Sequence, residues 1–168
     1  ILTADATEAL LEAGYEDDKR LRKALEWLKR MQAPDGMWIH LENAALTETD
    51  PDSTQRAIRA LIRAGESPDS STIKRACNAL EKFVSAEAEK WTEKWPVWSW
   101  VAPLDGLVAA GFKADNRTVQ QALEQIFKQQ TADGSWPDGY EVRVVPTLVE
   151  LGVIPREKAW GIIRKTES

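Results

Sequence analysis

Apolar residues recur every three or four positions along most of this chain, the spacing that gathers them on one face of an α-helix. The segment 21–28 is the clearest case, and segments 73–80 and 119–126 align with it. No stretch is a convincing strand, so no β-strand is expected. The pattern predicts an all-α fold of about four helical hairpins, with helices at 3–14 and 18–32, 50–64 and 70–87, 97–110 and 115–130, and 139–151 and 155–166.

The first helix of each predicted hairpin ends at a glycine, and these helices are copies of one another. Segments 6–14 and 57–65 share five identical residues, segment 103–111 follows the same register, and segment 144–152 is a looser copy. Glycine closes a helix because it adopts the left-handed backbone without steric cost. Small residues along one stripe allow neighbouring helices to approach closely. The sequence therefore predicts repeated hairpins that stack on one another.

Two of the second helices end in a Gln-x3-Gly-x-Trp segment. The first copy holds Gln32, Gly36 and Trp38, and the second copy, 98 residues later, holds Gln130, Gly134 and Trp136. The glutamine amide can satisfy free backbone groups at a helix end, and the indole covers the junction with a large apolar face. We interpret these residues as a structural repeat that stacks one hairpin on the next.

Charge and composition restrict the partners and the compartment. The formal net charge is −5 and the sequence pI about 5.1, which argues against a nucleic-acid partner. Cys77 is the single cysteine and His40 the single histidine, so neither an internal disulfide nor a histidine-based metal site is expected. No apolar run is long enough to span a membrane. We expect one cytoplasmic domain, 1–168, with peripheral membrane contact left open. The chain opens at Ile1 without a methionine, so it is either trimmed or a piece of a longer protein, and the number of hairpins favours the second expectation.

Three further segments carry a resemblance to a known family. The Asp-Pro-Asp-Ser-Thr sequence at 50–54 resembles the Asp-x-Asp-Asp-Thr acid motif of class II terpene cyclases, and is closer to an Asp-x-Asp-Thr-Thr variant. The Trp-rich segment 95–100 and the segment 136–152 follow in the family's order. With the Gln-Gly-Trp repeat, the chain resembles the (α/α) toroid of squalene–hopene cyclases and their relatives. It would be a shortened or incomplete toroid, because the complete one has more hairpins.

The resemblance implies proton-initiated cyclisation of a polyisoprenoid, either squalene or a prenyl diphosphate. Asp52 would be the general acid, Asp50 would tune or orient it, and Thr54 and Ser53 could hydrogen-bond the pair. Such a carboxyl group must stay neutral in a dry cavity, and the carbocations that follow need aromatic faces. The candidates for that cavity wall are Trp95, Trp98, Trp100 and Tyr140. The resemblance implies no metal cofactor, although a diphosphate substrate could recruit Mg²⁺.

The chain departs from the family in ways that keep a structural interpretation open. Ser53 stands where the acid motif has its last carboxylate, and the zinc ligands of the related prenyltransferases are absent. The same motif is typical of a helix start, with Asp50 as N-cap and Pro51 in the first turn. There the helix dipole would lower the pKa of Asp52, the wrong direction for a proton donor. The motif is therefore either a catalytic site or a helix cap, or both.

The remaining unusual residues have structural explanations. The tryptophan cluster at 95–100 has two equally weighted interpretations, as part of a cavity wall or as ordinary packing. We expect the others in the following places: Cys77, Trp27 and Trp160 in the core or between helices, His40 in a loop, and the charged run 87–94 in a solvated linker.

Two alternatives to an intact enzyme follow from the hairpin count. The chain could be a non-catalytic relative that binds an isoprenoid, another lipid or a protein partner, or it could be a fragment of a full cyclase. Four hairpins form an arc with exposed end faces, which need caps or partners. Two copies could close a ring. The expected partners are thus an isoprenoid, a second copy, or the remainder of a longer chain.

Overall fold

The computed structural model describes residues 2–16, 18–39 and 49–163. His40 lies outside these ranges, and the side chain of Trp160 is also outside the described part. The elements are α1 (Leu2–Glu12), α2 (Lys19–Arg30), β1 (Trp38–Ile39), β2 (Thr49–Asp50), α3 (Pro51–Arg63), α4 (Ser71–Ala86), α5 (Ala88–Thr92), α6 (Trp98–Ala109), α7 (Arg117–Lys128), the 3-10 turn η1 (Pro137–Gly139), α8 (Glu141–Glu150) and α9 (Arg156–Ile163). The predicted all-α class is confirmed, and each predicted hairpin corresponds to a pair of these helices.

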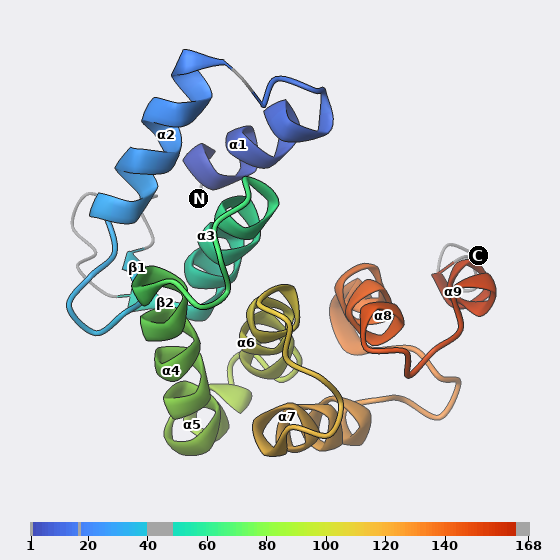
Figure 1. Ribbon diagram of the computed structural model, residues 1–168. Helices are drawn as coiled ribbons and strands as arrows, with labels where there is room; N and C mark the ends of the chain where they lie inside the picture. Colours follow the sequence, from blue (N-terminus) through green and yellow to red (C-terminus); the bar gives the residue numbers. More distant parts are fainter. Residues whose placement is uncertain (1, 17, 40–48, 164–168) are drawn as a thin grey trace.

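The first helices of the four hairpins form a row. Helices α1, α3, α6 and α8 pack against one another in chain order, and we call them the first-helix row (Figure 1). Helices α2, α4 and α7 lie on the outer side of this row and pack against it, and α9 packs against α8. The row brings the N-terminal parts of α3 and α8, which are far apart in the sequence, close enough for side-chain contact.

The four helices of the row end in the same way, as the repeated glycines predict. Gly14, Gly65, Gly111 and Gly152 have φ of 80°, 87°, 97° and 71°. After each glycine, the next N–H donates to the carbonyl of the repeat leucine at 2.9–3.1 Å: Tyr15 to Leu10, Glu66 to Leu61, Phe112 to Leu107 and Val153 to Leu148. This bond closes a helix through a left-handed residue that glycine adopts most readily.

The expectation of no β-strand is wrong at one place. Trp38 and Ile39 pair antiparallel with Thr49 and Asp50, with Trp38 opposite Asp50. Each strand has only two residues, too few to produce an alternating pattern in the sequence. The pairing places the first residues of α3 against the first Gln-Gly-Trp junction.

The charged run 87–94 is also more structured than a solvated linker. Residues 88–92 form α5, and the side chain of Ala88, its first residue, is fully buried. A single buried alanine anchors an otherwise exposed turn, and a hydrophobicity pattern averaged over the run does not reveal it.

The core lies between the first-helix row and the outer helices. One cluster joins α4, α6, α7 and α8 and contains Trp100 and Trp136, and another joins α3, α4 and α6 and contains Trp38 and Cys77. Cys77 therefore lies in the core as predicted, where burial, with a smaller contribution from Glu81, raises the pKa of its thiol to about 11. In the described part of the chain, every helix is too short or too polar to cross a membrane.

Candidate active site

The acid-like motif at 50–54 forms the start of α3. The Asp50 side chain accepts from the backbone N–H of Ser53 at 2.8 Å and from the Ser53 hydroxyl at 2.6 Å. Pro51 occupies the first turn, where its missing N–H costs nothing. Asp50 is therefore an N-cap in the usual geometry, as the helix-start interpretation predicts.

Thr54 is bonded to the backbone on both sides. Its hydroxyl donates to the carbonyl of Asp50 at 2.7 Å and accepts from the backbone N–H of Trp38 at 3.0 Å. Thr54 is fully buried. It thus joins α3 to the preceding Gln-Gly-Trp junction, and no hydrogen bond between its hydroxyl and Asp52 is present.

Asp52, the predicted proton donor, lies between two arginines. Arg143 Nη2 of α8 is 2.8 Å from Asp52 Oδ1, and Arg56 Nε of α3 is 3.1 Å from Oδ2. Asp52 is 9% exposed. The Gln55 amide is best satisfied with its nitrogen 2.7 Å from Asp105 Oδ2 and its oxygen 2.8 Å from Arg143 Nη2, which continues the cluster toward α6.

The surroundings of Asp52 favour its ionised form. Burial raises the pKa of this carboxyl group, but the positive charges of Arg143 and Arg56, and their hydrogen bonds, outweigh burial. The pKa of Asp52 is consequently held below its ordinary value. A carboxylate that two guanidinium groups hold in its ionised form is a structural anchor rather than a proton donor.

The ion pairs around Asp52 continue along the whole first-helix row. Arg56 also reaches Asp5 of α1 at 2.8 Å. Arg59 lies 2.8 Å from Asp105 of α6 and 3.7 Å from both Glu8 of α1 and Glu150 of α8. We call the set Asp52, Arg56, Arg59, Asp105 and Arg143 the arginine–carboxylate cluster. The cluster itself joins α3, α6 and α8, and its ion pairs with Asp5 and Glu8 extend it to α1.

Tyr140, one of the predicted aromatic candidates, lies close enough to Asp52 for the charge of Asp52 to affect the pKa of its hydroxyl group. Burial raises the pKa of its hydroxyl, Arg143 opposes the rise, and the negative charges of Asp138 and Asp52 add to it. Tyr140 directly precedes α8, so the turn that begins this helix places Tyr140 and Arg143 together. The structure thus brings the Tyr–Arg segment of the sequence to the acid-like motif.

The three predicted tryptophans have different surroundings. Trp100 is almost fully buried in the core, and its indole N–H donates to the Thr92 hydroxyl at 2.9 Å. Trp95 is 42% exposed, and its ring centroid lies 6.3 Å from that of the half-buried Trp98. The ring centroid of Trp91, which is also exposed, lies 6.4 Å from that of Trp98. These indoles form an outer aromatic patch and a core contact rather than one continuous cavity wall.

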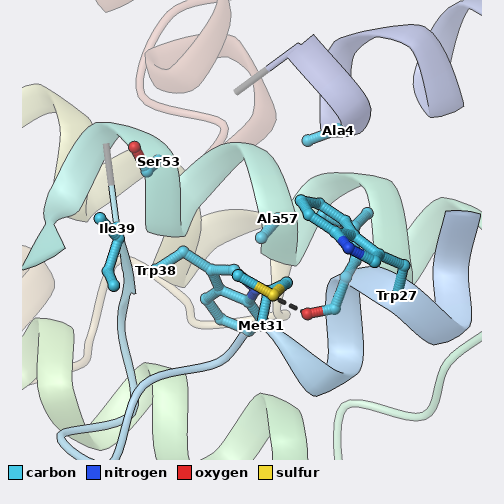
Figure 2. A pocket seen from close by; sticks show the side chains of 8 residues that line it. Ala4, Trp27, Met31, Trp38, Ile39, Ser53 and Ala57 are labelled. Carbon is cyan, nitrogen blue, oxygen red and sulfur yellow. Dashed lines mark hydrogen bonds between the residues drawn. The ribbon is translucent and has the colours of Figure 1, made fainter. Parts of the chain in front are cut away.

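A small apolar recess lies beside Ser53. Figure 2 shows its lining residues, Ala4, Trp27, Leu28, Met31, Trp38, Ile39, Ser53 and Ala57. Its volume is about 20 Å³, close to the room one water molecule needs and far below the roughly 300 Å³ of a small-molecule pocket. An isoprenoid chain does not fit in this recess as it stands.

The two Gln-Gly-Trp junctions have matching geometry. Gln32 Nε2 donates to the carbonyl of Gly36 at 2.8 Å, and Gln130 Nε2 donates to that of Gly134 at 2.7 Å. The indole N–H of Trp38 donates to Leu28 at 2.8 Å, and that of Trp136 donates to Ile126 at 2.9 Å. Both tryptophans are buried. Each segment therefore pins the loop after a second helix to the end of that helix.

Most members of the arginine–carboxylate cluster were not predicted from the sequence. Arg143 falls within the segment 136–152 that carries the family resemblance, but neither it nor Arg59 or Asp105 was predicted as a site residue. A signal was present: acids at 5, 8 and 12 on the first helix repeat with the same spacing as arginines at 56, 59 and 63 on the next. Such matched spacing predicts ion pairs between adjacent helices.

The described residues contain no group of three or more histidine, cysteine, aspartate or glutamate side chains placed to hold a metal ion. No protein-family model matches this chain, and no curated protein matches it at a significant level.

Proposed function

We propose that this chain is a non-catalytic relative of the class II terpene cyclases, a toroid-type hairpin domain that binds a protein partner and does not turn over an isoprenoid. The observation that carries the proposal is the bridging of Asp52 by Arg56 and Arg143. The side-by-side packing of the first helices with the second helices outside them supports the toroid-type arrangement.

The chemistry of alkene protonation explains why this bridging matters. The side chain of an ordinary aspartic acid has a pKa near 4, so at pH 7 only about one molecule in a thousand carries the proton. The two arginines lower the pKa of Asp52 further and hydrogen-bond the charged form. A proton donor needs surroundings that keep the carboxyl group neutral, such as an apolar pocket without cations.

Proton-initiated cyclisation is the second candidate function. It is favoured by the meeting of the acid-like motif with the Tyr140–Arg143 segment, both of which the sequence resemblance singles out. For this function the diphosphate of a prenyl substrate would draw Arg143 away from Asp52, because guanidinium groups pair strongly with phosphate oxygens. Asp52 would then lose one of the two cations that hold it ionised.

A product assay separates the two functions. The protein is incubated with squalene, farnesyl diphosphate and geranylgeranyl diphosphate, with and without Mg²⁺, and the extracts are analysed by gas chromatography and mass spectrometry. Asp52→Asn is the test variant, and Asp69→Asn, which alters an exposed ion pair with Lys74, is the matched control. We expect no cyclic product from any of the three proteins.

The contrary result is equally specific. A cyclic product formed by the wild type and by Asp69→Asn, but absent with folded Asp52→Asn, would overturn the non-catalytic proposal and establish the second candidate.

A further inference from the structure

Adjacent helices of the first-helix row meet through one repeated register. We call the residue ten positions before each stop glycine the forward position: Ala4, Gln55, Val101 and Val142. The residues eight, five and four positions before the stop glycine form the backward face of the same helix. At each internal contact of the row, the forward position of one helix lies near, or is buried in the same cluster as, backward-face residues of the next helix.

Three separate helix pairs support this register, one by a close backbone approach and two by shared buried clusters. Ala4 of α1 shares a buried cluster with Ala60 of α3. A Cβ placed on Gly106 of α6 would lie 3.1 Å from the Cβ of Gln55 in α3, so these backbones approach closely. Val101 of α6 lies in one core cluster with Val144 and Leu148 of α8.

The last helix of the row has an uncovered forward position. Ala4, Gln55 and Val101 are each 1–2% exposed, whereas Val142 of α8, in the same register, is 64% exposed. Val142 is an apolar side chain on the side of the helix that the repeat uses for contact with a following helix.

The first helix of the row has an uncovered backward face. Leu61, Leu107 and Leu148 are fully buried, whereas Leu10 of α1, the fourth member of this series, is 37% exposed. Ala6 and Ala9 of α1 are exposed as well, although their counterparts Ala57 and Ala60 are buried. The two ends of the row therefore carry the two complementary halves of an interface that occurs three times inside the chain.

We infer that a second copy of this chain docks head to tail, with Val142 of α8 from one copy against the Ala9 and Leu10 face of α1 from the other. The contact continues an interface already formed within the chain, in the same register and with the same class of side chains. A head-to-tail contact uses both uncovered surfaces, and two copies that make it twice close into a ring. This inference identifies the protein partner of the proposed function as a second copy of the chain, and it rests on that proposed function.

A mixing experiment tests the head-to-tail geometry. Leu10→Glu removes the backward face and leaves Val142 intact, and Val142→Glu does the reverse. By size-exclusion chromatography with light scattering, we expect wild type to have the mass of at least two chains and each variant alone to have the mass of one. An equimolar mixture should give a species of two chains, because one intact interface remains between unlike variants.

The controls keep the inference falsifiable. Both substitutions are at exposed positions, and circular dichroism checks that each variant is folded. Trp95→Gln alters an exposed aromatic side chain that belongs to neither face and should leave the wild-type mass unchanged. A wild-type chain with the mass of one copy at every concentration would overturn the inference, as would an assembly that Trp95→Gln abolishes and the other two variants leave intact. A single-copy mass would leave the product assay for Asp52 unaffected, so the two proposals can fail separately.

Discussion

The two Gln-Gly-Trp junctions have the same internal hydrogen bonds but differ in what surrounds their glycines. Gly36 has φ of 94° and Gly134 has φ of 90°, so both use the left-handed backbone. A Cβ on Gly36 would lie 2.5 Å from the carbonyl oxygen of Arg75 in α4, whereas a Cβ on Gly134 would meet only Gln130 Nε2, at 3.9 Å. The first junction is pressed against another helix, and the second is not.

The glutamines differ in the same way. Gln32 donates to the carbonyl of Thr72 in α4 at 2.9 Å as well as to Gly36, and its oxygen accepts from Arg75. Among the described residues, the side chain of Gln130 bonds only to Gly134. An identical motif thus specifies one local loop geometry, and the hairpin that follows decides whether the loop also becomes an interhelical contact.

The largest effect on stability that tests this comparison is expected when Gly36 and Gly134 are each replaced by alanine. Gly134→Ala should cost about 1–2 kcal/mol of unfolding free energy, the strain of a left-handed non-glycine residue. Gly36→Ala carries the same strain plus a clash with the backbone of α4, which adds about 1–3 kcal/mol. Urea unfolding of the two variants beside the wild type measures both costs. Equal losses of unfolding free energy in the two variants would mean that α4 moves to accommodate the added methyl group. The close packing at the first junction would then contribute nothing measurable to stability.

The next effect concerns the ion pair between Asp52 and Arg143. It joins α3, which follows the first junction, to α8, which follows the second. Asp52→Asn removes the negative charge that pairs with Arg143 of α8 and with Arg56 of α3. We expect the free energy of unfolding to fall by about 2 kcal/mol at pH 7, which is typical of hydrogen bonds to charged groups. Because the folded-state pKa of Asp52 is lowered, its contribution is fully present above the unfolded pKa, near 4, and disappears as the pH falls through the folded pKa.

The pH profile therefore provides an internal check on Asp52. The difference in unfolding free energy between wild type and Asp52→Asn should be largest near neutral pH and shrink below about pH 4. Asp69→Asn, at a side chain that is 86% exposed, should match the wild type at every pH. A difference between wild type and Asp52→Asn that stays constant down to acidic pH would contradict the ion-pair assignment.

Much of the fold could be predicted because the deciding signals are local. The stop glycines, the Asp50 cap and the helical spacing of apolar residues each act within a few positions, and the structure agrees with them. The β1–β2 pair and the buried Ala88 escaped prediction because each depends on contacts with residues outside the local sequence window.

The candidate site was less accessible to prediction because its chemistry depends on a long-range contact. Asp52 belongs to a motif that can be recognised in the sequence. The pKa of its side chain depends strongly on Arg143, which is 91 residues away in the sequence and reaches Asp52 only through the packing of α8. The aromatic candidates show the same dependence. Trp95 and Trp100 are five residues apart, yet one is exposed and the other is in the core.

The smallest expected effect tests how each junction satisfies the backbone N–H of its tryptophan. Trp38 donates to the Thr54 hydroxyl, and Trp136 donates to the Glu141 carboxyl group, two residues at equivalent distances before the stop glycines. Thr54→Val keeps the shape but leaves the buried N–H of Trp38 without its acceptor, so we expect a loss of about 1–2 kcal/mol by urea unfolding. Glu141→Gln keeps an oxygen for Trp136 and should cost less, particularly since the second Glu141 oxygen has no hydrogen-bond partner among the described residues. If Glu141→Gln proved the costlier change, the carboxylate would have a role at the second junction beyond accepting this hydrogen bond.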